Sequence, residues 1–403
     1  MIAEELAAWA AGLNPAEADR ELADRALLDT VAVAVAGRDE PVVRHAAALP
    51  ETVRWAVAAH VLDFDDLHME STTHISAVCV PAVLAAGGGA HAYLAAAGVM
   101  ARLGAALGWP HYSRGWHATT TAGAPAAAVG AGVALGLDAD RLATAMALAV
   151  PAAGGVQRAF GTDAKSLQVG FAAEAGVRAA RLAAAGAGAD PAALDQWLDL
   201  VGGDPKALDL SGPAVPGGLA VKIYPCCYAL QRPISALAEL DIDPAQVSRI
   251  VIRTPAGTVT PLTHHRPDTG LQGKFSLEYA AATALLDDHQ GIAAFTDEAV
   301  RRPEARRLME LVESELAPGG DHLLAGEFDA EVHTGDDVLR VRSEFPPGSP
   351  QRPPTRDELL RKAADCLAGT SLDAESIGWP SAGRLLREHL RTDHTGEEHA
   401  WRD

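Results

Sequence analysis

Four short polar segments interrupt an alanine-rich, apolar chain, and each contains a histidine or a lysine that suits acid–base or anion chemistry. They are LDFDDLHMESTTH (62–74), GWHATTT (115–121), FGTDAKSLQVG (160–170) and VKIYPCC (221–227). Charged and imidazole side chains are rare among small-residue helices unless they line a wet or reactive cavity. Four such segments, far apart in the sequence, suggest one site that folding assembles around a small anionic molecule.

The first segment contains three carboxylates within four residues, Asp63, Asp65 and Asp66. On a helix Asp63 and Asp66 share a face, and their like charge raises the cost of ionising both. Such a cluster binds a cation, meets a basic partner or has a perturbed pKa, whereas the structural alternative is a helix end with solvated acids. His74 follows in a Ser/Thr-rich loop, where functional side chains are common.

The other segments place single basic residues at the starts of helices or at a domain junction. His117 precedes Thr119 and a long small-residue helix, whose first amides and hydroxyls are potential donors to an anion, although capping alone also explains the threonines. Lys165 lies at a glycine-containing turn that enters a helix. Lys222 precedes a Tyr-Pro break at the apparent domain junction, where clefts often form.

Lysine is scarce in this chain, with five lysines (165, 206, 222, 274, 362) among 33 lysines and arginines. A retained lysine supplies a compact ammonium with a tunable pKa, although random surface lysines remain the alternative. Lys274 and Tyr279 open a helix in the second half of the chain. Tyr279 fits either a proton donor or ordinary packing.

The sequence predicts a mostly α fold with two domains. Residues 1–217 are predicted to be almost continuously helical, and Asn14-Pro15 marks the start of one of the helices. Pro and Gly break the helical pattern near 213–225. Strands are predicted at 248–255, 326–334 and 338–345, with a turn at 335–337 and helices at about 274–287 and 296–316. We therefore expect an all-α domain (1–217 and 355–403, with a polar tail) and an α+β domain (218–354) ending in a Pro-rich linker (346–354).

The formal charge of −20 argues against a nucleic-acid partner and an anionic membrane surface, because the chain offers no basic stripe. Thr121–Leu137 is the closest match to a membrane span, but its glycines favour an internal helix. The four cysteines show no metal-ligand spacing, and the acidic N-terminus does not resemble a signal peptide. These features predict a reduced, cytoplasmic protein.

Several segments resemble the MmgE/PrpD family, which contains 2-methylcitrate dehydratase, cis-aconitate decarboxylase and iminodisuccinate epimerase. The resemblance runs in order through most of the chain: ALLDTVAVAVAG (26–37), residues 59–86, RGWHATTTAGAPAAAVGAGVALGLD (114–138), residues 160–183, KIYPCCYALQRPISAL (222–237) and GKFSLEYAAATALL (273–286). It implies a large all-α domain formed by both termini, a smaller α+β lid and a homodimer without metal or organic cofactor. It also implies a site at the domain interface, lined by Asp63, His74, His117, Lys165, Lys222 and Tyr279.

The chain departs from the usual motifs of the family at four positions. Leu67 replaces the threonine of DFDDT, and Ile75 replaces the proline that commonly follows His74. Ser166 and Gln168 replace the proline and histidine of Lys-Pro-Leu-His. These departures bear on the identity of the substrate.

The expected activity is that of a cofactor-independent lyase, a dehydratase resembling 2-methylcitrate dehydratase, on a small di- or tricarboxylic acid. Removing a proton next to a carboxylate builds charge on its oxygens, so the site must supply cations. His117 or His74 would act as base and acid, Tyr279 as a proton donor, and Asp63 would orient an imidazole. For substrate binding the candidates are Lys222, Lys165, Asp66, Thr119 and Lys274.

Other activities stay open from the sequence. Decarboxylation and epimerisation can begin from the same stabilised carbanion as dehydration, and a diverged family member can be non-catalytic. An all-α terpene cyclase is the alternative from another class, because Asp63-Phe64-Asp65-Asp66 fits DxDD and Asp65-Asp66 with Glu70 resembles a magnesium–diphosphate motif. Aromatic residues make up only 5% of the chain, which is few for a cavity that stabilises carbocations.

Overall fold

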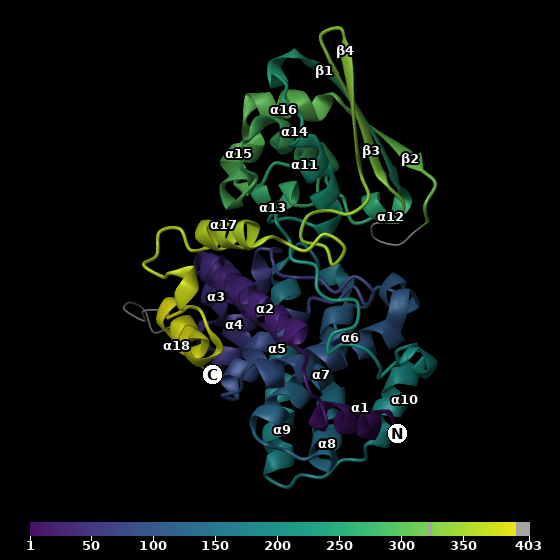
Figure 1. Ribbon diagram of the computed structural model, residues 1–403, viewed down its shortest axis with the longest axis vertical. Coiled ribbons are helices and arrows are strands. Elements are labelled where there is room, and N and C mark those ends of the chain that lie inside the picture. Colours follow the sequence, from purple (N-terminus) through teal and green to yellow (C-terminus); the bar gives the residue numbers. More distant parts are fainter. Residues whose placement is uncertain (321–324, 392–403) are drawn as a thin grey trace, which may run out of the picture.

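The computed structural model describes residues 1–320 and 325–391, in which a unit of packed helices lies against a smaller α+β unit (Figure 1). The helices of the first unit follow one another along the chain: α1 (Ile2–Ala11), α2 (Glu17–Ala36), α3 (Pro41–His45), α4 (Glu51–Val61), α5 (Ile75–Ala85), α6 (Ala90–Ser113), α7 (Ala118–Ala134), α8 (Ala139–Ala149), α9 (Asp163–Ala184) and α10 (Ala192–Leu200). Each unit has its own large cluster of buried apolar side chains. The mostly α fold that the sequence predicts is confirmed.

The α+β unit packs short helices against one face of a mixed sheet. Its elements are β1 (Val247–Pro255), β2 (Val312–Ala317), β3 (Phe328–Thr334), β4 (Asp337–Ser343), α11 (Gln231–Leu237), α12 (Ala256–Val259), α13 (Gly270–Gly273), α14 (Leu277–Leu286), α15 (Asp297–Arg301) and α16 (Pro303–Glu310). The strand order is β2-β1-β3-β4, with β1 and β2 parallel and the other pairs antiparallel. Phe328, Ala330 and Val332 of β3 alternate into the buried cluster, which explains why this strand was visible in the sequence.

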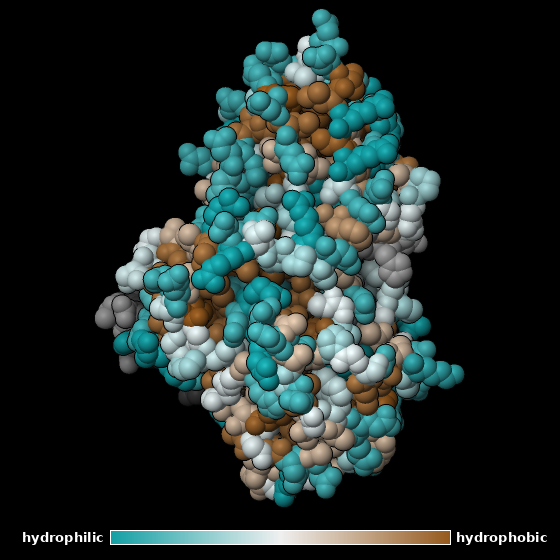
Figure 2. Space-filling view, in the orientation of Figure 1, coloured by the Kyte–Doolittle hydropathy of each residue, from teal (hydrophilic) through white to brown (hydrophobic). Residues whose placement is uncertain are grey.

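The opposite face of the sheet carries charged side chains. Arg253 of β1 lies 3.3 Å from Asp329 and 3.1 Å from Glu331 of β3, and Arg342 of β4 pairs with Asp329 at 2.8 Å. In Figure 2 the face of the molecule in view shows hydrophilic side chains interspersed with apolar patches, one of them over the α+β unit. One buried and one charged face is the usual arrangement of an exposed sheet.

The last two helices, α17 (Arg356–Cys366) and α18 (Trp379–His389), pack against α2 of the helical unit. Figure 1 shows α17 at the level where the two units meet. The preceding residues 346–354 form no helix or strand, as expected for a Pro-rich linker. The predicted polar tail falls largely on residues 392–403, which lie outside the described residues.

Two predicted elements need correction. The sequence predicts a helix over 296–316, but its last part, residues 312–316, lies in β2, whose register pairs Ile250 of β1 with Val312. Their glutamates and leucine favour a helix locally, and pairing with a distant strand overrides that preference. The first long helix starts at Glu17 rather than at Pro15, because the Asp19 carboxylate accepts the Ala16 N–H at 2.9 Å.

Small residues allow the central helices to approach closely, and Gly176 on α9 shows how closely. A Cβ at this position would lie 2.4 Å from Ala127 Cβ and 2.5 Å from Ala128 N on α7. We therefore expect Gly176→Ala to lower the free energy of unfolding by about 1–3 kcal/mol in chemical denaturation, despite the better helix propensity of alanine. Gly188→Ala, where nothing lies within 4 Å, is the control. Equal stability of the two variants would contradict this packing.

Helix α6 is the one described helix that is long and apolar enough to cross a membrane, but 83% of its apolar stretch is buried inside the protein. That burial is typical of a core helix. Thr121–Leu137, which the sequence suggested as an internal helix, lies mostly within α7, whose residues are buried from Ala118 to Gly132. All four cysteines are free and buried.

Candidate active site

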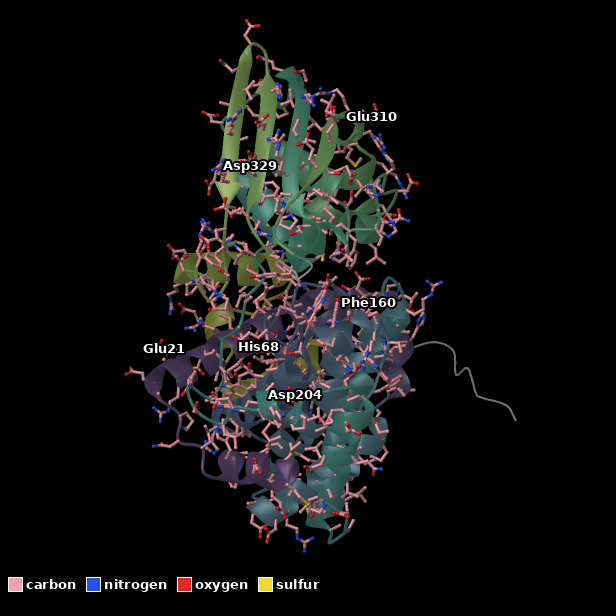
Figure 3. All side chains as sticks on the ribbon, turned by 90° about the vertical axis from the view of Figure 1, so that its right-hand side faces the viewer. Glu21, His68, Phe160, Asp204, Glu310 and Asp329 are labelled. Carbon is pink, nitrogen blue, oxygen red and sulfur yellow. The ribbon has the colours of Figure 1, made fainter. Side chains whose placement is uncertain are left out.

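A cavity of about 630 Å³ lies between the helical unit and the α+β unit and brings the four polar segments together. Phe160 lines it, and Figure 3 shows this residue at the top of the helical unit, near the α+β unit. Five of the residues predicted from the sequence also line the cavity: Asp63, His74, His117, Lys165 and Lys222.

Asp63 joins the two lysines of the cavity wall. Its Oδ1 accepts hydrogen bonds from Lys165 Nζ at 2.8 Å and from Lys222 Nζ at 2.9 Å. Burial acts to raise the pKa of Asp63, but Lys165 and Lys222 outweigh it and hold that pKa well below 3.8. Burial acts to lower the pKa of Lys222, and Asp63 more than offsets this, so the pKa is raised. Two ammoniums around one carboxylate leave one excess positive charge for an anion.

Asp65 points instead to two histidines. Its Oδ2 lies 2.7 Å from Nδ1 of His60 and 3.1 Å from Nδ1 of His74. Burial opposes the ionisation of Asp65, yet the two imidazoles hold its pKa well below 3.8. Burial lowers the pKa of His60 to about 4 in spite of Asp65, so His60 is neutral near pH 7. Because Asp65 faces both Nδ1 atoms, Nε2 of His74 is the nitrogen left to act on a ligand.

His117 adds a third imidazole to this group. Its ring centroid lies 6.0 Å from that of His60 and 4.9 Å from that of Phe160. Burial lowers the pKa of His117 well below 6.5, with a further contribution from His60. Its Nδ1 has no hydrogen-bond partner among the described residues. A neutral imidazole in the wall of a cavity suits hydrogen bonding to a substrate or acceptance of a proton.

The backbone between α4 and α5 explains why Asp63 and Asp65 have different partners. Helix α4 ends at Val61, and Asp63 has a φ of 53°, in the left-handed region that aspartate tolerates better than most residues. Asp63 thereby reaches the lysines, while Asp65 contacts His60 on α4 and His74 at the start of α5. Asp63 and Asp66 do not share a helical face, because residues 62–74 are not helical.

Tyr279 and Lys274 were predicted at the site, but neither lines the cavity. The Tyr279 hydroxyl donates a short hydrogen bond to the Ala294 carbonyl, and burial raises its pKa to about 12. Lys274 Nζ donates to the Leu62 carbonyl at 2.6 Å. Both residues were predicted from the same motif. The Lys274 side chain turns into the domain junction and that of Tyr279 into the α+β core, where it has no access to a substrate.

Asp66 and Thr119 also have protein partners in place of a substrate. Asp66 accepts the Ser76 N–H at 3.1 Å and a short hydrogen bond from the Ser76 hydroxyl. Thr119 Oγ1 accepts the His74 N–H at 3.1 Å and is fully buried. Thr119 therefore fixes the backbone of His74, and Asp66 anchors the start of α5.

The structure adds residues that the sequence did not single out for the site. His60 lies on α4 five residues before Asp65, and a histidine beside an acidic cluster was the available signal. Trp109 and Tyr112 line the cavity from the end of α6, just after Gly108 interrupts the helix with a φ of 60°. No pattern in the sequence marked this kink as part of a site.

The three aspartates do not form a magnesium–diphosphate motif, because each has different protein donors. This arrangement removes the basis for the terpene-cyclase alternative. His60, Asp65 and His74 could supply three metal ligands. However, ligand atoms around a tetrahedral zinc lie about 3.3 Å apart, given metal–ligand distances near 2.0 Å. The 2.7 Å contact with His60 is a hydrogen bond and the 3.1 Å contact with His74 is a close polar contact, which fit a carboxylate that orients two imidazoles.

Asp66 offers a test of this electrostatic arrangement. Burial raises its pKa to about 7, so the folded protein binds a proton that the unfolded chain, with a pKa near 3.8, releases. A raised folded-state pKa stabilises the protein at low pH, and this contribution is lost as the pH rises to about 7. We expect the stability of wild type relative to Asp66→Asn to fall by about 2 kcal/mol between pH 5.5 and 7 and then to level off. Urea denaturation at several pH values measures this difference, and a pH-independent difference would contradict it.

Two domain models of one protein family match consecutive parts of the chain. Residues 52–198 match the MmgE/PrpD N-terminal domain, and residues 224–377 match the MmgE/PrpD C-terminal domain. Cis-aconitate decarboxylase of Aspergillus terreus (strain NIH 2624 / FGSC A1156) is 27% identical over 362 residues, which cover 78% of this chain and 73% of that protein. Cis-aconitate decarboxylase of Mus musculus is 27% identical over 297 residues, covering 65% and 59%.

Proposed function

The chain belongs to the MmgE/PrpD family, and we propose that it is a lyase that acts on a small di- or tricarboxylic acid. In the proposed reaction the C–C bond to one carboxylate of this acid breaks and CO₂ leaves. One observation carries the proposal. A single cavity holds the excess positive charge of Asp63, Lys165 and Lys222 together with histidines that can transfer protons.

The chemistry requires both parts of this site. When CO₂ leaves an unsaturated acid such as cis-aconitate, the electron pair of the broken C–C bond forms a new C=C bond. The electrons of the old double bond move to the carbon next to a retained carboxylate, and negative charge spreads onto its oxygens. Cations beside those oxygens stabilise the transition state, and a proton donor completes the reaction at the carbon.

We assign these tasks to lining residues, with their contacts as support. Lys165 and Lys222 hold the retained carboxylate, because their shared counterion Asp63 neutralises only one of them. His74 donates the proton through Nε2, since its Nδ1 faces Asp65 at 3.1 Å. His117 is neutral and binds the substrate by a hydrogen bond.

Decarboxylation is favoured over the dehydration that the sequence suggested. The relatives reported above are cis-aconitate decarboxylases. A dehydratase also needs an acid for the departing hydroxyl, and Tyr279, the candidate for that role, bonds to Ala294 inside the α+β unit. The proposed reaction therefore acts on the same class of acid but breaks a C–C bond, where a dehydratase would break a C–O bond.

We also propose that residues 1–217 and 355–403 act as one domain and residues 218–354 as a lid. Two observations support this division: the separate apolar cores and the cavity that lies between them. The homodimer and the cytoplasmic location stay predictions from the sequence.

Proton NMR in deuterium oxide tests the proposed function with cis-aconitate, citrate, 2-methylcitrate and substituted succinates as substrates. We expect cis-aconitate to give 2-methylenesuccinate with one deuterium on the carbon next to the retained carboxylate. Loss of water from 2-methylcitrate would instead support the dehydratase, and deuterium exchange without a new product would support an epimerase. No change in any substrate would contradict a lyase acting on this class of acid.

A further inference from the structure

Four of the five lysines of this chain converge on the turn formed by residues 62–64, which we call the clamped turn. One of them, Lys165, bonds to the Asp63 side chain. The others donate hydrogen bonds to the carbonyl oxygens of three consecutive residues: Lys274 Nζ to Leu62 O at 2.6 Å, Lys222 Nζ to Asp63 O at 2.7 Å and Lys362 Nζ to Phe64 O at 2.7 Å. The turn that contains the left-handed Asp63 is therefore held from three sides.

The three donating lysines come from different parts of the fold. Lys222 lies on the connection into the α+β unit, Lys274 directly follows α13 of that unit, and Lys362 lies on α17. All three are buried, with 1%, 8% and 4% of their surface exposed. The clamped turn is thus the point at which the α+β unit and helix α17 both contact the connection between α4 and α5.

Buried ammoniums are expensive, so their placement calls for an explanation. Lys362 Nζ lies 2.5 Å from Asp29 Oδ1 and 4.0 Å from the ring centroid of Phe64. Lys274 forms no ion pair with any carboxylate of the described residues, and burial lowers its pKa to about 8. An apolar side chain would fill this position at lower cost, whereas only a donor can hold the Leu62 carbonyl.

We propose that Lys274 and Lys362 are positioning residues, which hold the clamped turn so that Asp63 and Asp65 stay aligned with the lysines and histidines of the cavity. Neither lysine lines the cavity, so they act through the turn and not on a substrate. Loss of either contact lets Asp63 relax from its φ of 53° and shifts its carboxylate away from Lys165 and Lys222. The expected fall in kcat rests on the proposed function, whereas the expected loosening of the clamped turn does not.

The experiment compares Lys274→Met and Lys362→Met with Lys206→Met in the full-length chain. Methionine keeps the length and removes the donor, and Lys206 is the exposed fifth lysine. We expect kcat per folded molecule to fall about 10- to 100-fold in the first two variants, with KM changed less than about threefold, because displacement by about 1 Å costs this much in rate. Hydrogen exchange of a peptide spanning 59–68, followed by mass spectrometry, should become at least about tenfold faster. Lys206→Met should change neither.

A purely structural role predicts a different pattern, with lower thermal stability but unchanged kcat per folded molecule and unchanged exchange of the turn. That result in both variants would overturn the proposal. If a methionine variant does not fold, the matching arginine variant replaces it. Arginine keeps a charged donor, but its larger head group must displace the carbonyl that it contacts, so we expect faster exchange of the turn and a smaller loss of kcat than in the methionine variants. An arginine variant with lowered thermal stability but wild-type kcat and wild-type exchange of the turn would overturn the proposal.

The exchange measurement also separates this inference from the proposed function. If wild type converts no acid in the panel, the proposed function fails, but faster exchange of the turn in the methionine variants still supports the clamp. If wild type is active and the turn already exchanges as fast as an exposed loop, the clamp fails and the proposed function stands.

Discussion

The His74→Asn variant is expected to fold normally and to lose about 10³-fold in kcat/KM on the acid that wild type decarboxylates. Asparagine removes the acid, is smaller than histidine, and places an amide where Nδ1 of His74 faces Asp65, so this polar contact can be kept without a clash. Neutral His60 and His117 remain in the variant, but their lowered pKa values make them poor acids to donate a proton near pH 7. Steady-state kinetics and circular dichroism measure the two parts of this prediction.

His91→Asn is the matched control, because His91 is exposed at the start of α6. It should keep wild-type kcat/KM. If His74→Asn instead retains activity within about tenfold of wild type, His74 does not deliver the proton. A loss of equal size in kcat and kcat/KM is the expected pattern, because the proton transfer occurs only in the transition state.

Sequence periodicity predicted the fold well where local preference and packing agree. Alanine-rich runs became α2, α7 and α9, and the alternation in residues 328–334 became β3. The failure at residues 312–317 has a physical cause, because a parallel strand depends on a partner some 60 residues away in the chain, and Arg249 and Arg253 of β1 pair there with Glu313 and Glu315. No local pattern contains that information.

At the site, too, the sequence predicted which residues take part but not which partners they contact. Residue type and isolation marked Asp63, His74, His117, Lys165 and Lys222, and all five line one cavity. The partners of each side chain depended on features that only the folded backbone has. The left-handed turn at Asp63 separates two neighbouring aspartates into a lysine group and a histidine group. The burial of Tyr279 against Ala294 likewise depends on how α14 packs, which its own sequence does not reveal.

Asp63→Asn is expected to lower the free energy of unfolding by about 3–5 kcal/mol, because it leaves two buried ammoniums without their counterion. Lys222 is 1% exposed at its side chain and Lys165 is 14% exposed, so water compensates little. Asparagine keeps the shape of the side chain and tolerates the left-handed backbone, so the loss reports charge and not strain. Urea denaturation at pH 7 measures it.

The Asp63→Asn/Lys222→Met double variant separates charge from packing. Once the carboxylate is absent, removing one ammonium also removes an uncompensated buried charge, so the double variant should lose clearly less stability than the sum of the two single variants. Additive losses would mean that Asp63 and Lys222 do not form the pair described here.

The same pair predicts a pH dependence of definite sign. The folded-state pKa of Asp63 lies well below 3.8, so its contribution is fully present above that pH and is lost as the pH falls below it. The difference in stability between wild type and Asp63→Asn should therefore be constant from pH 5 to 7 and shrink below about pH 4. A difference that instead grew on acidification would assign the proton to Asp63 at neutral pH, and the excess positive charge that the proposed reaction needs would then be two rather than one.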